Sequence, residues 1–72
     1  MPPKIRELKS ELRRAGFVMR IGKGSHTVWM HPDLPDVQLT LSGHDGDDAH
    51  RYQERDVRDI LARLHKRQRE LS

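Results

Sequence analysis

The stretch Gly22-Lys23-Gly24-Ser25-His26-Thr27 combines residue types that could act together on a phosphodiester. Two glycines let a backbone turn sharply and approach a ligand closely. Lys23 supplies a cation, Ser25 can donate a hydrogen bond, and the imidazole of His26 can take or give a proton near neutral pH. Backbone N–H groups and Lys23 could therefore hold a phosphate while His26 acts on one of its oxygens. An ordinary β-hairpin turn with a surface histidine would use the same residues.

A second cluster, His44-Asp45-Gly46-Asp47-Asp48-Ala49-His50, brings carboxylates and imidazoles together. Hard oxygen ligands combined with imidazole nitrogens suit several divalent metal ions. A solvated acidic loop, in which Asp47 or Asp48 accepts hydrogen bonds from nearby backbone N–H groups, accounts for the same residues. We favour the acidic loop, and we expect no metal and no small-molecule cofactor.

The spacing of apolar residues predicts a helix near each end of the chain. One stripe predicts a helix over residues 3–15 and consists of Ile5, Leu8, Leu12 and Ala15. Gly16 follows it as a left-handed C-cap. A second stripe predicts a helix over residues 53–70 and consists of Val57, Ile60, Leu61 and Leu64. The last few residues are polar almost all round, so we expect them to fray.

Between the helices the apolar period changes from 3.6 to 2, which indicates strands over residues 17–21, 25–31 and 37–41. Short connections, including a proline-containing turn over residues 32–36, make these an antiparallel meander. A polar loop over residues 42–52 follows. The order α-β-β-β-α predicts a small α+β domain with two helices on one face of a three-stranded antiparallel sheet, the architecture of double-stranded-RNA-binding domains.

Strand alternation assigns side chains to the two faces of the sheet. It turns two sets toward the helices: Phe17, Met19 and Ile21 in the first strand, and Val37, Leu39 and Leu41 in the third. In the second strand it places Val28 and Met30 on the covered side, with His26 at its rim. Trp29 then lies on the open face. There it could stack on an RNA base, contact a protein partner, or simply pack on Arg20.

Length and composition exclude several classes of protein. The 72 residues are 35% charged and 33% hydrophobic. They have room for one domain, residues 1–72, with a thin core. The absence of cysteine excludes disulfides and thiolate metal sites. No apolar run is long enough to cross a membrane, and the first residues lead directly into a charged helix rather than a signal peptide. We therefore expect a cytoplasmic protein with no membrane contact.

Charge is segregated along the chain. Residues 1–31 carry seven Lys and Arg against two Glu, a net charge of +5. Residues 32–50 carry five Asp and no Lys or Arg, a net charge of −5, and residues 51–72 carry seven basic against four acidic residues, a net charge of +3. A basic balance favours polyanions such as RNA or DNA, although a solvated surface would have the same composition.

Short motifs spread over almost the whole chain carry a family resemblance. They are Arg14-Ala15-Gly16-Phe17, Gly22-Lys23-Gly24-Ser25-His26, His31-Pro32, Leu41-Ser42-Gly43, Gly46-Asp47-Asp48-Ala49, Tyr52-Gln53-Glu54 and Val57-Arg58. In this order and at these distances, the chain resembles the HicA toxin family of bacterial HicA–HicB toxin–antitoxin systems.

The resemblance implies a fold, an activity and two partners. HicA toxins are similar to double-stranded-RNA-binding domains in fold, and they are understood as endoribonucleases of the mRNA interferase type. The histidine of the Gly-Ser-His motif, here His26, is the residue that the family needs for activity. The implied partners are an mRNA substrate and a HicB-like antitoxin that blocks the site. The chain departs from the family at His44 and His50, where Lys or Arg is expected.

The residues around His26 fit a cleavage that needs no metal. The ribose 2′-OH attacks its own phosphate, neutral His26 accepts the proton, and Lys23 or Arg20 stabilises the phosphate charge beside Gly24 and Ser25. The second proton transfer stays open between water and His44. Two alternatives remain: a non-catalytic RNA-binding module of the same fold, and a protein whose only ligand is its antitoxin.

Overall fold

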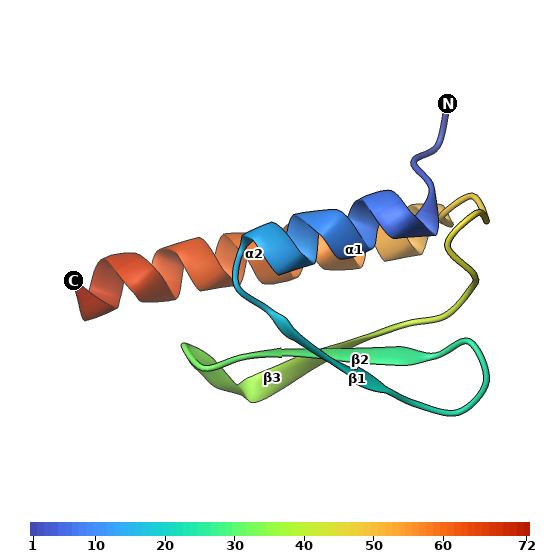
Figure 1. Cartoon of the computed structure of the whole chain (residues 1–72). Coiled ribbons are helices and arrows are strands. Elements are labelled where there is room, and N and C mark those ends of the chain that lie inside the picture. The colour runs from blue at the N-terminus through green and yellow to red at the C-terminus, as the bar shows by residue number, and fades with distance from the viewer.

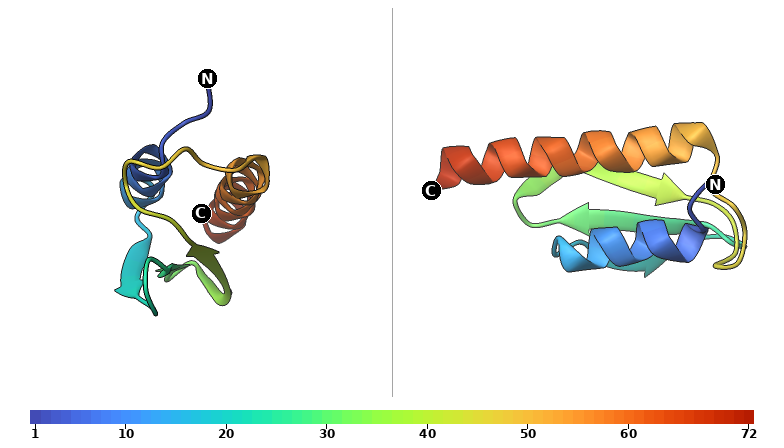
Figure 2. Two further views of the ribbon diagram at one scale, coloured as in Figure 1. Left: turned by 90° about the vertical axis from the view of Figure 1, so that its right-hand side faces the viewer. Right: turned by 90° about the horizontal axis from the view of Figure 1, so that it is seen from above.

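Five elements follow one another in the order α-β-β-β-α in the computed structural model, which describes residues 1–72. They are α1 (Ile5–Arg14), β1 (Val18–Ile21), β2 (Thr27–His31), β3 (Leu34–Leu41) and α2 (Arg51–Leu71). The strands form one antiparallel sheet in the order β1-β2-β3. Both helices lie on the same side of this sheet, as the end-on view makes plain (Figures 1 and 2). The predicted α+β architecture is therefore confirmed.

Local signals explain where α1 begins and ends. The Glu7 carboxylate accepts a hydrogen bond from the Lys4 N–H ahead of the first turn, at 3.2 Å. At the other end Gly16 has φ +94°, its N–H donates to the carbonyl of Arg13, and the Phe17 N–H donates to that of Leu12. This pair of bonds is a Schellman motif, so the predicted C-cap at Gly16 is confirmed.

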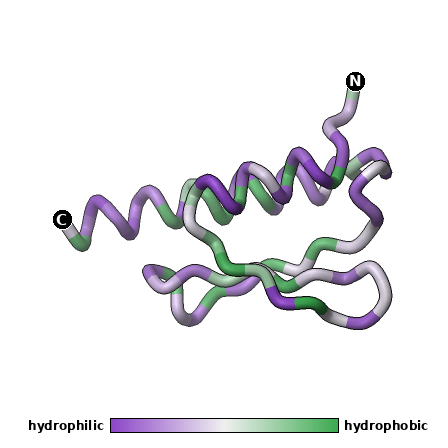
Figure 3. The backbone as a smooth tube through the Cα atoms, in the orientation of Figure 1, coloured by the Kyte–Doolittle hydropathy of each residue, from purple (hydrophilic) through white to green (hydrophobic).

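Helix α2 begins two residues earlier than the apolar stripe predicts, because the side chain of Gln53 caps it. Its Oε1 accepts the backbone N–H of His50 at 2.8 Å, and its Nε2 donates to the carbonyl of Ser42 at 2.9 Å. Gln53 is buried in the process. The helix continues to Leu71, and its hydrophilic C-terminal part extends past the sheet (Figures 1 and 3).

The core lies between the sheet and the two helices and contains eleven apolar residues. Trp29 is at its centre and has no exposed surface. Its indole Nε1–H donates to Thr27 Oγ1 at 2.9 Å, and the guanidinium of Arg13 lies over its ring at 5.4 Å. A buried indole therefore has a partner for its polar atom as well as close packing.

The predicted faces of β2 are wrong. Trp29, Thr27 and His31 point toward the helices, while Val28 and Met30 are only half-buried. The register explains this arrangement, since Trp29 stands between Met19 of β1 and Leu39 of β3. The largest apolar side chain occupies the covered face, and the polar side chains beside it are accommodated by hydrogen bonds. Trp29 is thus unavailable to RNA or to a partner protein.

Two smaller expectations about the strands also need correction. Strand β3 begins at Leu34 rather than Val37, because the register shifts between Met30 and His31 and brings Leu34 opposite His31 in a buried position. Ile21, predicted to face the helices from within the core, is 72% exposed. Ile21 is the last residue of an edge strand, so few neighbouring side chains cover it. Phe17 and Leu41 are buried as predicted.

Candidate functional site

The connection between β1 and β2 is a tight turn closed by its own backbone. The Gly22 N–H donates to the carbonyl of His26 at 2.9 Å, and the His26 N–H donates to that of Lys23 at 3.0 Å. Gly24 has φ +58°, a conformation that side-chain-bearing residues rarely adopt. The turn therefore presents Lys23 and His26 on a short, fixed loop, as the glycines predict.

His26 lies at the surface, not at the covered rim of the core that strand alternation predicted. It directly precedes β2, and because the faces of that strand are reversed, it belongs to the open side. Its imidazole makes no hydrogen bond within the chain, whereas its backbone closes the turn. The ring is therefore free to meet a ligand.

The side of the turn that faces α1 borders an open hollow of about 290 Å³. The polar residues that line it are His26, His44, Ser25, Thr27, Lys9 and Asp45. These residues come from three segments: the β1–β2 turn with the first residue of β2, helix α1 and the loop after β3. The structure thus brings together the two clusters that the sequence shows as separate.

Hydrogen bonds hold the loop after β3 against the turn and against α1. Ser25 Oγ accepts the Gly43 N–H at 3.1 Å. The Asp47 carboxylate accepts the His44 N–H at 2.9 Å, which confirms the expectation that an aspartate of this loop serves the backbone. The first backbone N–H groups of α1, at Ile5 and Arg6, donate to carbonyls of this loop at 2.9 and 3.2 Å. These helix-end donors would otherwise lack partners.

Lys9 is the cation inside the hollow, and Asp45 neutralises it. Its Nζ lies 2.7 Å from Asp45 Oδ1, and its side chain is only 13% exposed. The hydrogen bond from Lys9 and its charge hold the pKa of the Asp45 carboxyl below its ordinary value, with smaller help from Arg13 and Arg6 and against slight desolvation. An incoming phosphate could therefore displace the Asp45 carboxylate and form an ion pair with Lys9 in its place.

The predicted phosphate-binding residues do not all meet at this hollow. Gly24 and Ser25 line it, but Arg20 and Lys23 do not. Both are exposed nearby, and Arg20 pairs with Val28 across the strands on the open face of the sheet. The sequence does not identify Lys9 as a site residue, because its position beside the turn depends on how α1 is oriented about its axis in the folded protein.

The acidic loop does not assemble a metal-ligating cluster. No group of three or more His, Cys, Asp or Glu side chains is placed to hold a metal ion. Asp45 faces Lys9, Asp48 pairs with Lys4, and Asp47 bonds to the backbone of His44. The carboxylates of this loop are thus spread over three different partners.

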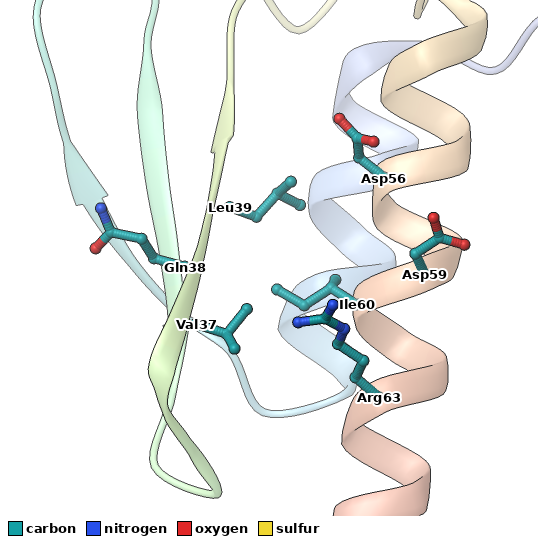
Figure 4. Close-up of a pocket in the computed structure, with 7 residues that line it drawn as sticks. All are labelled: Val37, Gln38, Leu39, Asp56, Asp59, Ile60 and Arg63. Atoms are coloured by element: carbon teal, nitrogen blue, oxygen red, sulfur yellow. The ribbon is translucent and has the colours of Figure 1, made fainter.

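A groove between β3 and α2 has a different character (Figure 4). Its lining consists of Val37, Gln38, Leu39, Asp56, Asp59, Ile60 and Arg63. It shares no residue with the hollow beside His26 and contains no imidazole. Its two carboxylates would repel a phosphate, and it offers only one guanidinium to attract one. We therefore place the candidate site at the hollow beside His26.

Comparison with known protein families decides what kind of protein carries this site. A family model described as the HicA toxin of bacterial toxin–antitoxin systems matches residues 5–66. The chain belongs to the HicA toxin family. The match runs from the first residue of α1 well into α2, so it includes the Gly22–His26 turn and the loop that carries His44.

No curated protein and no solved structure gave a significant match to this HicA-family chain. The likeness to double-stranded-RNA-binding domains therefore stays a prediction that rests on element order. No helix has the length and apolar character that a membrane span requires. Membership in the HicA family makes the chain a toxin-type component of a toxin–antitoxin system.

Proposed function

We propose that this HicA-family toxin is an endoribonuclease that cleaves mRNA in the cytoplasm without a metal ion, with His26 as its catalytic histidine. The observation that carries the proposal is the position of the His26 imidazole. His26 is exposed, its imidazole makes no hydrogen bond within the chain, and the residue lines a hollow that Lys9 also lines. A free general base and a neighbouring cation are the two groups that such a cleavage requires.

The chemistry needs three things from the protein: a proton acceptor, a cation and close backbone approach. Neutral His26 takes the proton from the ribose 2′-OH as that oxygen attacks the adjacent phosphorus. The exposed Lys23 and Arg20 offset the charge that develops on the phosphate, and Lys9 does so once the phosphate displaces Asp45 from it. Gly24, which has no atom within 4 Å of the place where a Cβ would stand, leaves room for the RNA backbone.

The decisive experiment compares the purified wild-type protein with His26→Ala on an mRNA transcript. Loss of a general base typically lowers the rate by about 10²–10⁴-fold, and we expect a loss of that size. The fold should be unchanged because the side chain is exposed and unbonded, which circular dichroism and thermal melting will check. Wild-type cleavage should persist in EDTA, since none of the proposed steps uses a metal.

Two other outcomes point to the alternative functions. RNA binding without cleavage would favour a non-catalytic RNA-binding module. Absence of both, with tight binding to a HicB-like antitoxin, would favour a protein whose only ligand is that partner. Cleavage by His26→Ala at the wild-type rate would overturn the assignment of His26.

A further inference from the structure

One hydrogen bond joins the two segments that carry His26 and His44. Ser25 Oγ accepts the backbone N–H of Gly43 at 3.1 Å. His26 directly follows Ser25 and His44 directly follows Gly43, so each histidine is one residue away from the bonded pair. Both histidines are among the residues that line the same hollow of about 290 Å³. The two histidines, 18 positions apart in the sequence, thus lie at a single site.

The backbone that carries His44 is held from several directions. Gly43 has φ +111°, and a Cβ there would stand 3.3 Å from Cγ1 of Ile5. The His44 N–H donates to the Asp47 carboxylate and its carbonyl accepts the Asp47 N–H, both at 2.9 Å. The His44 imidazole itself makes no hydrogen bond within the chain. The residue is therefore anchored through its backbone while its ring is free, which is the same arrangement as at His26.

We propose that His44 is the second proton-transfer group of the site, the general acid that protonates the leaving 5′ oxygen. The inference rests on the proposed ribonuclease function and completes it. The 2′ oxygen forms a bond to phosphorus as His26 removes its proton, and the bond from phosphorus to the 5′ oxygen breaks as protonated His44 delivers a proton to that oxygen. The products are a 2′,3′-cyclic phosphate and a 5′-hydroxyl end. One proton enters the protein and one leaves it, and exchange with water restores the starting forms.

The surroundings suit the two histidines to opposite roles. His44 lies on the acidic loop, with Asp45 beside it and the Asp47 carboxylate bonded to its own N–H. His26 closes the turn that carries the cation Lys23, and that turn contains no carboxylate. Lys9, which reaches the hollow from α1, is already paired with Asp45. His44 is therefore the acid and His26 the base.

The test uses two oligoribonucleotides that span a cleavage site mapped on a transcript. One is ordinary RNA, and the other carries sulfur in place of the leaving 5′ oxygen at that site. A thiolate leaves without being protonated, so the sulfur substrate needs no general acid. We expect His44→Ala to cleave ordinary RNA about 10²–10⁴-fold more slowly than the wild type and to cleave the sulfur substrate close to the wild-type rate. His26→Ala should be slow on both substrates.

The pH–rate profile provides an independent readout. Wild-type cleavage of ordinary RNA should follow a bell, because one imidazole must be neutral and the other protonated. His44→Ala should lose the alkaline limb, on which the acid is lost, and keep the acid limb. His65→Ala is the matched control. It removes an exposed imidazole of α2 that does not line the hollow, so it should leave both the rate and the bell unchanged.

The possible results separate this inference from the function on which it rests. Suppose that the wild type cleaves RNA and that His44→Ala either cleaves it at the same rate or loses the same factor in rate on both substrates. Then His44 is not the general acid, although the proposed ribonuclease function is supported. If the wild type cleaves no RNA, the proposed function itself fails. A second variant, His44→Asn, keeps a polar side chain on the loop and should behave like His44→Ala, provided that thermal melting shows both variants folded.

Discussion

His26 and His31 stand at opposite ends of β2 in opposite environments. His31 is buried, its ring meets the edge of the Phe17 ring at 5.1 Å between centroids, and both of its nitrogens are engaged. Nδ1 accepts the Asp33 N–H at 3.0 Å, and Nε2 lies 3.0 Å from the carbonyl of Ala15. Because Nδ1 accepts, the proton of the neutral ring must be on Nε2, which donates to Ala15. His31 is thus a structural residue that ties β2 to the end of α1.

Replacing His31 should reduce stability rather than chemistry. His31→Ala removes two hydrogen bonds and leaves the carbonyl of Ala15 and the N–H of Asp33 without those partners. We expect a loss of about 2–4 kcal/mol in the free energy of unfolding. Thermal melting will measure it, with His26→Ala as the matched control that should melt like the wild type. Equal melting temperatures for both variants would contradict the structural role of His31.

For individual residues, the sequence predicts His26 as the candidate catalytic residue, but it does not predict which residues surround it in the fold. The glycines predict the fixed turn that the structure has, whereas the exposed imidazole of His26 contradicts its predicted position at the covered rim of the core. Lys9 and the position of His44 beside His26 depend on how α1 and a distant loop pack together. Neither spacing nor residue type carries that information, so His44 enters the sequence argument only as an alternative to water.

Helix α1 and the loop after β3 meet at the Lys9–Asp45 pair, and this contact should limit the affinity for RNA. Asp45→Ala removes the carboxylate that neutralises Lys9 and keeps the backbone carbonyl that accepts the Arg6 N–H. We expect tighter RNA binding. One additional phosphate contact should also steepen the slope of log K against log salt by about 0.7–0.9.

Fluorescence anisotropy with labelled RNA at several salt concentrations will measure both changes, in a His26→Ala background that prevents cleavage. Asp36→Ala is the control, because it removes the same charge from an exposed position of β3 that forms no ion pair. An equal gain in affinity for both variants would mean that only net charge matters. The assay should be run near neutral pH. The lowered pKa of Asp45 keeps its carboxylate charged there, and the pair weakens only as the pH falls below the ordinary aspartate value.

The elements themselves follow closely from sequence patterns, and the failures have identifiable causes. Both helices, all three strands and the C-cap at Gly16 are predicted. The faces of β2 are not, because Val28 and Met30 make one face wholly apolar, while Trp29 shares the other face with the polar Thr27 and His31. What decides the face is the hydrogen bond from the Trp29 indole to Thr27, which lets a hydroxyl enter the core. Such a pairing is visible only once the strand is folded.

The whole molecule presents a basic turn and the exposed His26, which we propose as the catalytic histidine, on one region of its surface. An antitoxin that blocks the proposed site would bind this region. We expect a HicB-like partner to cover His26 together with Arg20 and Lys23. An acidic partner surface would gain association rate and orientation from these cations, and it would compete with RNA phosphates for them. Exposed apolar side chains of β1, Val18 and Ile21, can supply the apolar centre of such an interface.

Amide hydrogen exchange of the free and the antitoxin-bound toxin will test this arrangement. Residues 20–30 should become protected, while the far end of α2, residues 65–71, serves as an internal control that stays unchanged. RNA binding should weaken strongly with salt, because each phosphate contact releases counterions, and the protein complex should weaken less. If residues 20–30 exchange equally in both states, neutralisation works at a distance from the site.

The buried position of Trp29 determines how this protein can be observed by fluorescence. It is the only tryptophan of the chain, and its indole is shielded from water on all sides. Its emission therefore reports on the opening of the core, and unfolding and refolding can be followed without any label. Binding at the Gly22–His26 turn should leave that emission unchanged, so titrations with RNA or antitoxin require a dye on the ligand. A change in emission on adding RNA would mean that the core rearranges.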